Sequence, residues 1–419
     1  MVGAGLSEQR NLRSGDVPWD DKAWQLPSAD PLPGRRVDVA ILGAGIMGSI
    51  LAERLSASGR SVALLDRRPP GCGSTAASTA EVMWAMDVPL LHLADRIGEE
   101  AAARRWLRVY RAVQGLSQRI DALGVDGAKV ERPTVYLAGD LLDQKQLRQE
   151  AELHIRHGLP SSFLDPGQTA ARFEIAPRAA IVSDGGFEID PVRLSHALLE
   201  LARGRGATLS YPINVTSLLQ TGEGVKLTAD RGLTLEAGDV IVATGYERAP
   251  LLLPDAFSLL STFVIATPPG TAPLWRDNAM IWEASDPYLY LRTDRDGRVI
   301  AGGEDIDQAD DRVRDALLPA KAGAIAAKLE ALLGRSVRID RAWAATFGAS
   351  PDGLPAIGRS SLLPHVWLSA GYGGNGLAFA ALAAELLEQA LAGEQDADAA
   401  AFDPYRFEAH EGEERKTAS

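Results

Sequence analysis

Hydrophobic and polar positions alternate in a recognisable order between residues 37 and 68. An apolar run is followed by a glycine turn, a segment with apolar residues at helical spacing, and a second apolar run, "SVALLD". Short apolar runs bounded by turns predict buried strands, whereas apolar residues three and four positions apart predict a helix. This part of the chain is therefore predicted to form a strand, a helix and a second strand.

The remaining pattern predicts a second group of elements. Residues 90–124 and 191–206 show helical spacing, and the second of these segments ends at a glycine, which is typical of a helix end. Short strands separated by turns are expected within 224–245, and one strand, a glycine turn and a helix are expected within 366–393. Between these lie the predicted strands 261–268, 287–293 and 298–304 and a predicted helix 320–334.

Composition restricts the class of protein. The chain has 419 residues and a formal net charge of -13, whereas nucleic-acid binding requires clustered Lys and Arg, so we expect no nucleic-acid partner. Cys72 is the only cysteine, which excludes an intrachain disulfide and fits a reducing, cytoplasmic location. The first residues show no secretory signal pattern, and the most apolar segment contains Glu385 and Glu388, so no membrane span is expected. The six histidines show no metal-ligand spacing, and we predict no metal site.

The glycine turn indicates a nucleotide site. Gly43, Gly45 and Gly48 fit the spacing G-x-G-x-x-G, in which glycines allow a tight turn, close approach of a pyrophosphate and close packing of helix on strand. The helix N-terminus then favours the negative phosphates. Asp66 ends the second strand, where an acidic residue binds a ribose hydroxyl. These residues predict a dinucleotide, either NAD or FAD, with Arg67 and Arg68 as pyrophosphate ligands or surface charges.

Further segments, in the order in which they occur, carry a family resemblance. They are "GCGSTAASTAEVMWAMD", "GGFEIDPVRLSHALLELARGRGATL", "VIVATGYERAPLL", "DGRVIAGGED", "PDGLPAIGR" and "GYGGNGLAFA". Together they resemble the D-amino-acid oxidase superfamily of FAD-dependent oxidoreductases, in particular its glycine oxidase, sarcosine oxidase and gamma-glutamylputrescine oxidase-like branch. The resemblance covers about Trp19 to Phe407. It implies FAD as the cofactor and oxidation of the C–N bond of an amine or amino acid, by hydride transfer to flavin and hydrolysis of the imine.

The resemblance also implies an α/β fold with discontinuous domains. We expect a Rossmann-like FAD-binding domain with a parallel sheet, and a substrate domain with a mixed or antiparallel sheet and helices. An N-terminal arm, which carries no chemistry and is held by Trp19 and Trp24, precedes them. The expected limits are 1–36 for the arm, 37–91, 178–253 and 341–400 for the FAD-binding domain, 92–177 and 254–340 for the substrate domain, and 401–419 for a tail.

The cofactor residues implied by the resemblance come from four parts of the chain. The first glycine turn and Asp66 would bind the ADP half, Val215 would lie beside the adenine, and Thr244 with Gly245 would form a second cofactor turn. The C-terminal glycine turn opens a helix, and its N–H groups could face the flavin pyrimidine edge, where reduction adds negative charge. The expected cofactor-binding residues are Gly43, Gly45, Ile46, Met47, Gly48, Asp66, Arg67, Arg68, Ser74, Thr75, Ala77, Ser78, Thr79, Val215, Thr244, Gly245, Gly371, Tyr372, Gly373, Gly374, Asn375 and Gly376.

Candidates for the substrate side come from three parts of the chain. Arg292 lies on the strand where relatives carry a substrate-binding arginine, and a guanidinium suits a carboxylate. Strand alternation places Tyr288 and Tyr290 on the same face as Arg292. Tyr372 is either next to the flavin or stacked in the core. Glu81 replaces the apolar residues usual in relatives, and it either binds a substrate ammonium or lies on a helix surface.

Two departures from the family pattern leave alternatives open. The cysteine and histidine that attach flavin covalently in some members are missing, so noncovalent FAD is expected. The segment "LSTFVIATPP" has no lysine where some relatives place one that activates oxygen, so the electron acceptor is O2 or another acceptor. The alternatives are a noncatalytic or electron-transferring flavin subunit of a hetero-oligomer and an NAD-dependent dehydrogenase; a homo-oligomer is possible.

Overall fold

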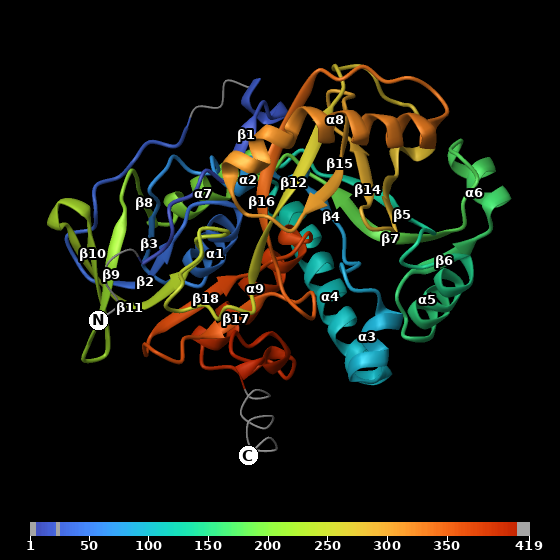
Figure 1. The fold of residues 1–419 in the computed structure, drawn as a ribbon. Coiled ribbons are helices and arrows are strands. Elements are labelled where there is room, and N and C mark those ends of the chain that lie inside the picture. Colours follow the sequence, from blue (N-terminus) through green and yellow to red (C-terminus); the bar gives the residue numbers. More distant parts are fainter. Residues whose placement is uncertain (1–5, 22–25, 409–419) are drawn as a thin grey trace, which may run out of the picture.

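The computed structural model describes residues 6–21 and 26–408, and its two sheets confirm the predicted α/β architecture (Figure 1). Trp24, expected to hold the N-terminal arm, lies outside the described residues. Trp19 does fix the arm, since its side chain is buried and its Nε1 donates a hydrogen bond of 3.2 Å to the Ser78 carbonyl. The strand β1 (Arg13–Gly15) also joins the arm to β16 (Arg341–Ala349).

The first sheet is built around the predicted strand–helix–strand unit. Its parallel strands are β18 (Val366–Ala370), β11 (Thr234–Val242), β2 (Val37–Leu42), β3 (Val62–Leu65) and β8 (Thr208–Ser210), in that order. The last four residues of β2 are all buried, as expected for a strand covered on both faces. The antiparallel β17 (Ala356–Arg359) forms one edge, and β9 (Val215–Thr221) and β10 (Gly224–Ala229) extend from β11.

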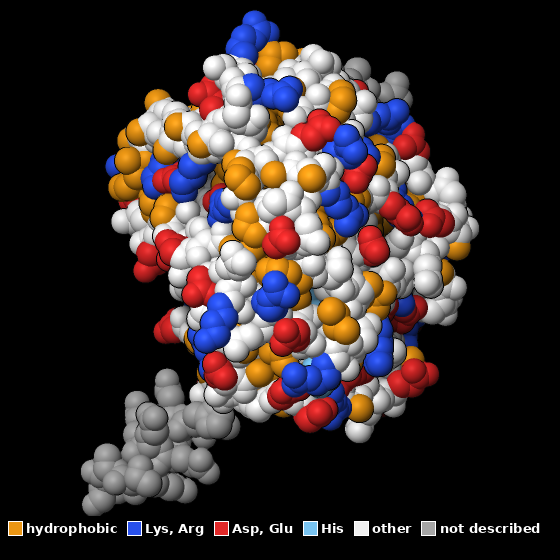
Figure 2. Space-filling model, turned by 90° about the vertical axis from the view of Figure 1, so that its right-hand side faces the viewer, with side chains coloured by type: hydrophobic (Ala, Val, Ile, Leu, Met, Phe, Trp, Pro, Cys, Tyr) orange, Lys and Arg blue, Asp and Glu red, His pale blue; other side chains and the backbone are white. Residues whose placement is uncertain are grey.

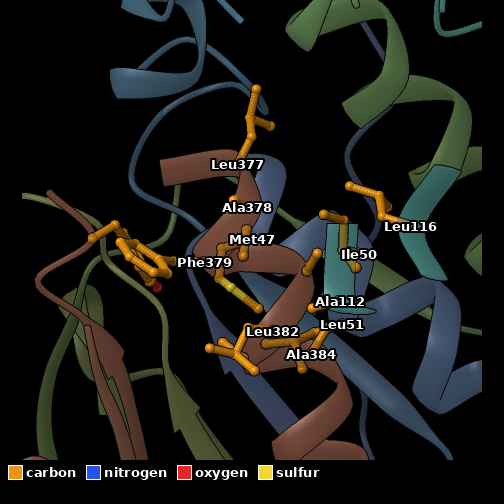
Figure 3. Close-up of a cluster of buried hydrophobic side chains, with 14 of the residues drawn as sticks. Met47, Ile50, Leu51, Ala112, Leu116, Leu377, Ala378, Phe379, Leu382 and Ala384 are labelled. Carbon is orange, nitrogen blue, oxygen red and sulfur yellow. The ribbon is translucent and has the colours of Figure 1, made fainter. Parts of the chain in front are cut away.

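Helices α1 (Ile46–Ala57), α7 (Pro191–Gly204), α9 (Gly376–Leu391) and α4 (Glu99–Leu123) pack around this sheet and around one another. Figure 3 shows their shared core, in which Met47 and Ile50 from α1 lie near Leu382 from α9 and Leu116 from α4. The segment 90–124 forms two helices rather than one, because Gly98 adopts a φ of +87° between α3 (Leu90–Ile97) and α4.

The second sheet is mixed, as predicted. Its strands run β1, β16, β12 (Ser258–Ala266), β15 (Val299–Ile306), β14 (Leu289–Thr293), β13 (Met280–Glu283), β5 (Val130–Leu137), β7 (Ala180–Glu188) and β4 (Glu81–Val82). Of the pairs in this order, β13 with β5 is parallel and the others are antiparallel. Helix α8 (Asp311–Leu333), longer than the predicted 320–334, packs on β12, β15 and β16 (Figure 1). Beyond β7 lie β6 (Ser161–Leu164), α5 (Gln144–Arg156) and α6 (Pro166–Phe173).

The sheets divide the chain differently from the expected domain limits. Strands β7 and β16 lie within the ranges expected for the cofactor domain, yet both pair in the second sheet. Helix α4 lies within the range expected for the substrate domain, yet it packs on α9. The expected limits were wrong for these elements because neither long-range strand pairing nor helix docking leaves a local signal in the apolar pattern.

The surface bears both signs of charge. On the face shown in Figure 2, Lys and Arg side chains are interspersed with Asp and Glu side chains. Within the described residues, no helix is both long enough and apolar enough to cross a membrane.

Candidate functional site

A cavity lies between the two sheets, at the carboxyl ends of the parallel strands. Its wall includes Gly43 after β2, Asp66 after β3 and Thr244 after β11, together with Thr262 from β12 and Tyr290 from β14. Ligands of doubly wound sheets bind at this edge, because the strand ends and helix N-termini leave backbone groups free there. The cavity therefore joins the predicted nucleotide turn to residues of the second sheet.

The first glycine turn has the backbone that the sequence predicted. Gly43 adopts a φ of +114°, and a Cβ there would collide with the Ala243 carbonyl. A Cβ on Gly48 would collide with the Gly43 carbonyl, so this glycine sets the close approach of α1 to β2. The N–H of Ile46, at the start of α1, donates a 2.9 Å hydrogen bond to the Thr75 hydroxyl. A Cβ on Gly45 would come within 2.9 Å of the Thr75 hydroxyl on the cavity wall, so the missing side chain there leaves room that fits a pyrophosphate.

The acidic residue after β3 is already engaged by the turn. Asp66 accepts hydrogen bonds from the N–H groups of Ala44 (2.7 Å) and Arg68 (2.8 Å). Burial raises its pKa, and these two hydrogen bonds oppose the increase. Arg68 in turn makes a two-pronged ion pair with Glu247, at 3.0 and 2.6 Å, and Arg67 bonds to Ser7. Both arginines line the cavity, with a carboxylate close to each.

Most of the expected cofactor residues come together on this wall. Gly48 and Gly371 do not reach the cavity; Gly48 packs on Gly43, and Gly371 packs on Phe257. The expected residues that line the cavity are Gly43, Gly45, Ile46, Met47, Asp66, Arg67, Arg68, Ser74, Thr75, Ala77, Ser78, Thr79, Val215, Thr244, Gly245, Tyr372, Gly373, Gly374, Asn375 and Gly376.

The C-terminal turn is arranged differently from the first one. The N–H of Gly374, which the sequence suggested would face the cofactor, donates a 2.9 Å hydrogen bond to the Asp87 carboxylate. Burial raises the pKa of Asp87, and this hydrogen bond lowers it. Tyr372 lines the cavity, but its hydroxyl bonds to the carbonyl and hydroxyl oxygens of Ser369. Tyr372 is thus a largely buried residue whose ring reaches the cavity wall and whose hydroxyl is held by β18.

Glu81 lies at the end of the cavity away from Val215 and Asp66, on strand β4 rather than on a helix. It pairs across the sheet with Glu188, which accepts a 3.1 Å hydrogen bond from Arg132. Glu81 Oε1 is buried and has no hydrogen-bond partner. Burial raises the pKa of Glu81 to about 8; the positive charge of Arg292 opposes this increase, and Glu188 adds to it.

A second carboxyl and two tyrosines complete this end. Tyr288 and Tyr290 line the cavity with their rings 5.7 Å apart. The pKa of Asp305 is raised to about 6 by burial, and the neighbouring hydroxyls of Thr262 and Tyr288 oppose the increase. The pKa of Tyr290 is raised by burial and then by the charges of Asp305 and Glu81. The phenol of Tyr290 therefore lies within the electrostatic reach of both carboxyls.

Arg292 does not lie on the cavity wall. It follows Tyr290 on the same face of β14, as strand alternation predicted, but its side chain is 1% exposed and enters the protein interior. Its guanidinium donates to the Ile189 carbonyl (3.0 Å) and lies 3.8 Å from Glu188 Oε2. Its Nε has no hydrogen-bond partner, but Arg292 is not among the residues that line the cavity, so the expected contact with a substrate carboxylate has no support in this geometry.

Several lining residues were not found from the sequence. They include Trp282, which stacks on Tyr136 at 3.8 Å between ring centroids, and Tyr246, whose hydroxyl donates to the Gly373 carbonyl. Leu6, Ser7 and Leu12 also line the cavity, so the arm, expected to carry no chemistry, contributes to the site. No sequence pattern predicts which aromatic residues face one another across strands.

Comparisons with known proteins identify the family of this chain. Residues 38–390 match the family model of FAD-dependent oxidoreductases named DAO. A 4-methylaminobutanoate oxidase (formaldehyde-forming) from Paenarthrobacter nicotinovorans is 25% identical over 410 residues, which are 92% of this chain and 47% of that protein. The chain thus spans about half the length of that relative. A D-amino acid dehydrogenase from Cereibacter sphaeroides is 25% identical over 409 residues, 85% of this chain and 92% of that protein.

Solved structures share the fold. The glycine oxidase of Geobacillus kaustophilus has a TM-score of 0.72 at 19% identity, covering 88% of this chain and 98% of its own. The L-proline dehydrogenase of P. horikoshii has a TM-score of 0.75 at 20% identity, covering 90% of this chain and 99% of its own. The family assignment replaces the alternative of an NAD-dependent dehydrogenase. The chain belongs to the DAO family of FAD-dependent oxidoreductases.

Proposed function

We propose that this protein oxidises the C–N bond of an amine or amino acid with noncovalently bound FAD, and that water then hydrolyses the imine. The observation that supports this most is the continuous cavity, which runs from the glycine cradle at Gly45 to the group formed by Glu81, Tyr288 and Tyr290. FAD supplies a hydride acceptor when it is bound. The cavity-lining residues between Gly43 and Thr79, together with Val215 and Thr244, would hold FAD.

The residues of the second sheet would position the substrate. Amine oxidation by hydride loss requires an unprotonated nitrogen and a fixed orientation more than a strong acid or base. In its carboxylate form, Glu81 lies where it could take a proton from an incoming ammonium, and the aromatic rings of Trp282 and Tyr290 in the same wall would help to exclude water. The electron acceptor is O2 or another acceptor.

The first test is an anaerobic titration. The purified protein is expected to show a flavin spectrum that bleaches with members of a panel of amino acids, N-methyl amino acids and amines; readmission of oxygen then distinguishes an oxidase from a dehydrogenase. Acid precipitation should release the flavin into the supernatant if it is noncovalent. A flavin spectrum that no compound bleaches would contradict the proposed turnover and favour a noncatalytic flavin subunit.

A pair of glycine variants tests the cofactor site. Gly45→Val places a branched side chain in the cradle, next to the Thr75 hydroxyl, and we expect this protein to purify folded but colourless. Gly34→Val is the matched control, because a Cβ there meets no atom within 4 Å and Gly34 has no positive φ. Visible absorbance per polypeptide is the measurement. Retention of the full flavin content in Gly45→Val would place the cofactor elsewhere.

A further inference from the structure

The charges of the cavity are distributed unequally between its two ends. Among its described lining residues, Arg67 and Arg68 are the only arginines or lysines, and both lie at the nucleotide end, beside Glu247. The other end has Glu81 and Asp87 in its wall. A substrate that enters this end therefore meets acidic groups and no lining arginine or lysine.

The residue best suited to bind a substrate carboxylate is removed from this end. Arg292 is buried behind the wall, and its charge lies against Glu188 and lowers the pKa of Glu81. Arg292 is therefore placed as a counter-ion for Glu81 and Glu188. An α-amino acid would have to desolvate its carboxylate at this end without a cationic partner in the wall, which is costly whether Glu81 is neutral or charged.

The same end suits a cation. Glu81 Oε1 is buried, has no hydrogen-bond partner in the protein, and belongs to a side chain in the cavity wall. A buried polar atom without a partner is costly, and a ligand that donates to it removes that cost. Trp282, Tyr288 and Tyr290 line the wall near it, and the faces of such rings attract alkylated ammonium groups.

We propose that the substrate is a cationic alkylamine without a carboxylate beside its nitrogen, and that Glu81 binds this nitrogen against the aromatic wall of Trp282, Tyr288 and Tyr290. This inference rests on the proposed function and specifies its substrate class. Glu81 is a binding residue in this scheme, and Arg292 is a positioning residue that acts through the charge of Glu81 and Glu188.

The protonation of Glu81 follows from its neighbours. Without a ligand, burial and Glu188 favour its neutral form, Arg292 favours its charged form, and its pKa is about 8. The further titratable groups at this end are Asp87, Tyr288 and Tyr290 in the wall, and Asp305 behind Tyr288 and Tyr290. A bound cation favours the carboxylate, so a cation should bind more tightly as the pH rises through 8.

The experiment compares matched substrate pairs on the FAD-loaded protein. Each pair is an amino acid and the amine that remains after removal of its carboxylate, such as proline and pyrrolidine or N-methylalanine and N-methylethylamine. Under anaerobic conditions, the amines are expected to bleach the flavin at concentrations at least about tenfold lower than the amino acids. Bleaching by amino acids at equal or lower concentrations would overturn the inference and leave the proposed function standing.

A second measurement does not depend on turnover. Tetramethylammonium cannot lose a proton, and its binding is read from the perturbed flavin spectrum and from the thermal shift. Its affinity is expected to rise about tenfold between pH 7 and pH 9, following ionisation of Glu81. Glu81→Gln should lose this pH dependence and bind the probe about tenfold or more weakly at pH 9. Glu131→Gln, on a side chain that is 79% exposed, is the matched control and should behave as the wild type.

The outcomes separate the two proposals. If no amine or amino acid bleaches the flavin, the proposed function fails, but tetramethylammonium binding still decides whether the cation site exists. Equal probe binding by the wild type and Glu81→Gln, when both hold FAD and unfold at similar temperatures, would overturn the inference.

Discussion

Two glutamates inside this protein, Glu150 on α5 and Glu81 on β4, have opposite surroundings. Glu150 is completely buried, and its two carboxylate oxygens accept the N–H groups of Leu90 (2.7 Å) and Leu91 (2.6 Å). His154 Nε2 lies 3.2 Å from Oε1 as well. Glu81 has no such set of partners, and its Oε1 has none at all. A buried carboxyl whose oxygens are all engaged stabilises the fold, whereas one that lacks a partner beside a cavity is available to a ligand.

The residues around Glu150 resemble a catalytic arrangement but have no access to the cavity. His154 Nδ1 lies 3.0 Å from Ser161 Oγ, so serine, histidine and glutamate form a hydrogen-bonded chain. This order resembles a hydrolytic triad, but Ser161 Oγ is also bonded to Ser183 Oγ at 2.8 Å. None of these residues lines the cavity between the sheets. These three hydrogen-bonded residues therefore fix the start of α3 against α5 and have no access to a substrate in the cavity.

The largest expected effect on this comparison comes from Glu150→Ala. It leaves the N–H groups of Leu90 and Leu91 buried without an acceptor, and we expect the free energy of unfolding to fall by about 3 kcal/mol. Thermal and urea unfolding measure this loss. Glu152→Ala, on the exposed face of the same helix, is the control and should change stability by less than about 0.5 kcal/mol. A loss equal to that of the control would show that Glu150 has no structural role.

Glu81→Gln is expected to change stability in the opposite direction at high pH. The pKa of Glu81 is about 8 in the folded protein and has an ordinary value of 4.5, so the unfolded chain releases its proton first. The contribution of the neutral carboxyl is fully present below pH 4.5 and is lost as the pH rises through 8. With FAD bound but no substrate or cationic probe present, the free energy of unfolding of the variant near pH 9 should therefore exceed that of the wild type by about 1–2 kcal/mol. A stability difference that stays constant from pH 5 to pH 9 would contradict this.

Ser161→Ala should have the smallest effect. It removes one hydroxyl from the chain that holds His154, and we expect a loss of about 1 kcal/mol in the free energy of unfolding. Tetramethylammonium affinity and its pH dependence should stay unchanged, because this group lies apart from the cavity. A change in probe affinity in this variant would show that the two regions are coupled, and the comparison would then fail.

The nucleotide end of the cavity was predictable because its determinants are local. Gly43, Gly45 and Gly48 lie within one turn, and Asp66 follows after a single helix and strand. The requirement for a positive φ or a missing side chain acts at each glycine separately, so spacing along the chain is sufficient evidence. The sequence by itself thus determined the Rossmann-like unit, the dinucleotide turn and, through its ordered motifs, the family.

The make-up of the substrate end of the cavity depended on the tertiary structure. Alternation along β14 placed Arg292 on the face of Tyr290, yet only the pairing of β4, β7 and the arm decides that Arg292 is enclosed while Glu81 reaches the cavity. Glu81 and its neighbours Glu188 and Arg292 are more than 100 residues apart in sequence, as are Gly374 and its partner Asp87. Burial and charge depend on distances in space, which summed local preferences do not specify, so the substrate site and its acidity emerge only when the sheets are assembled.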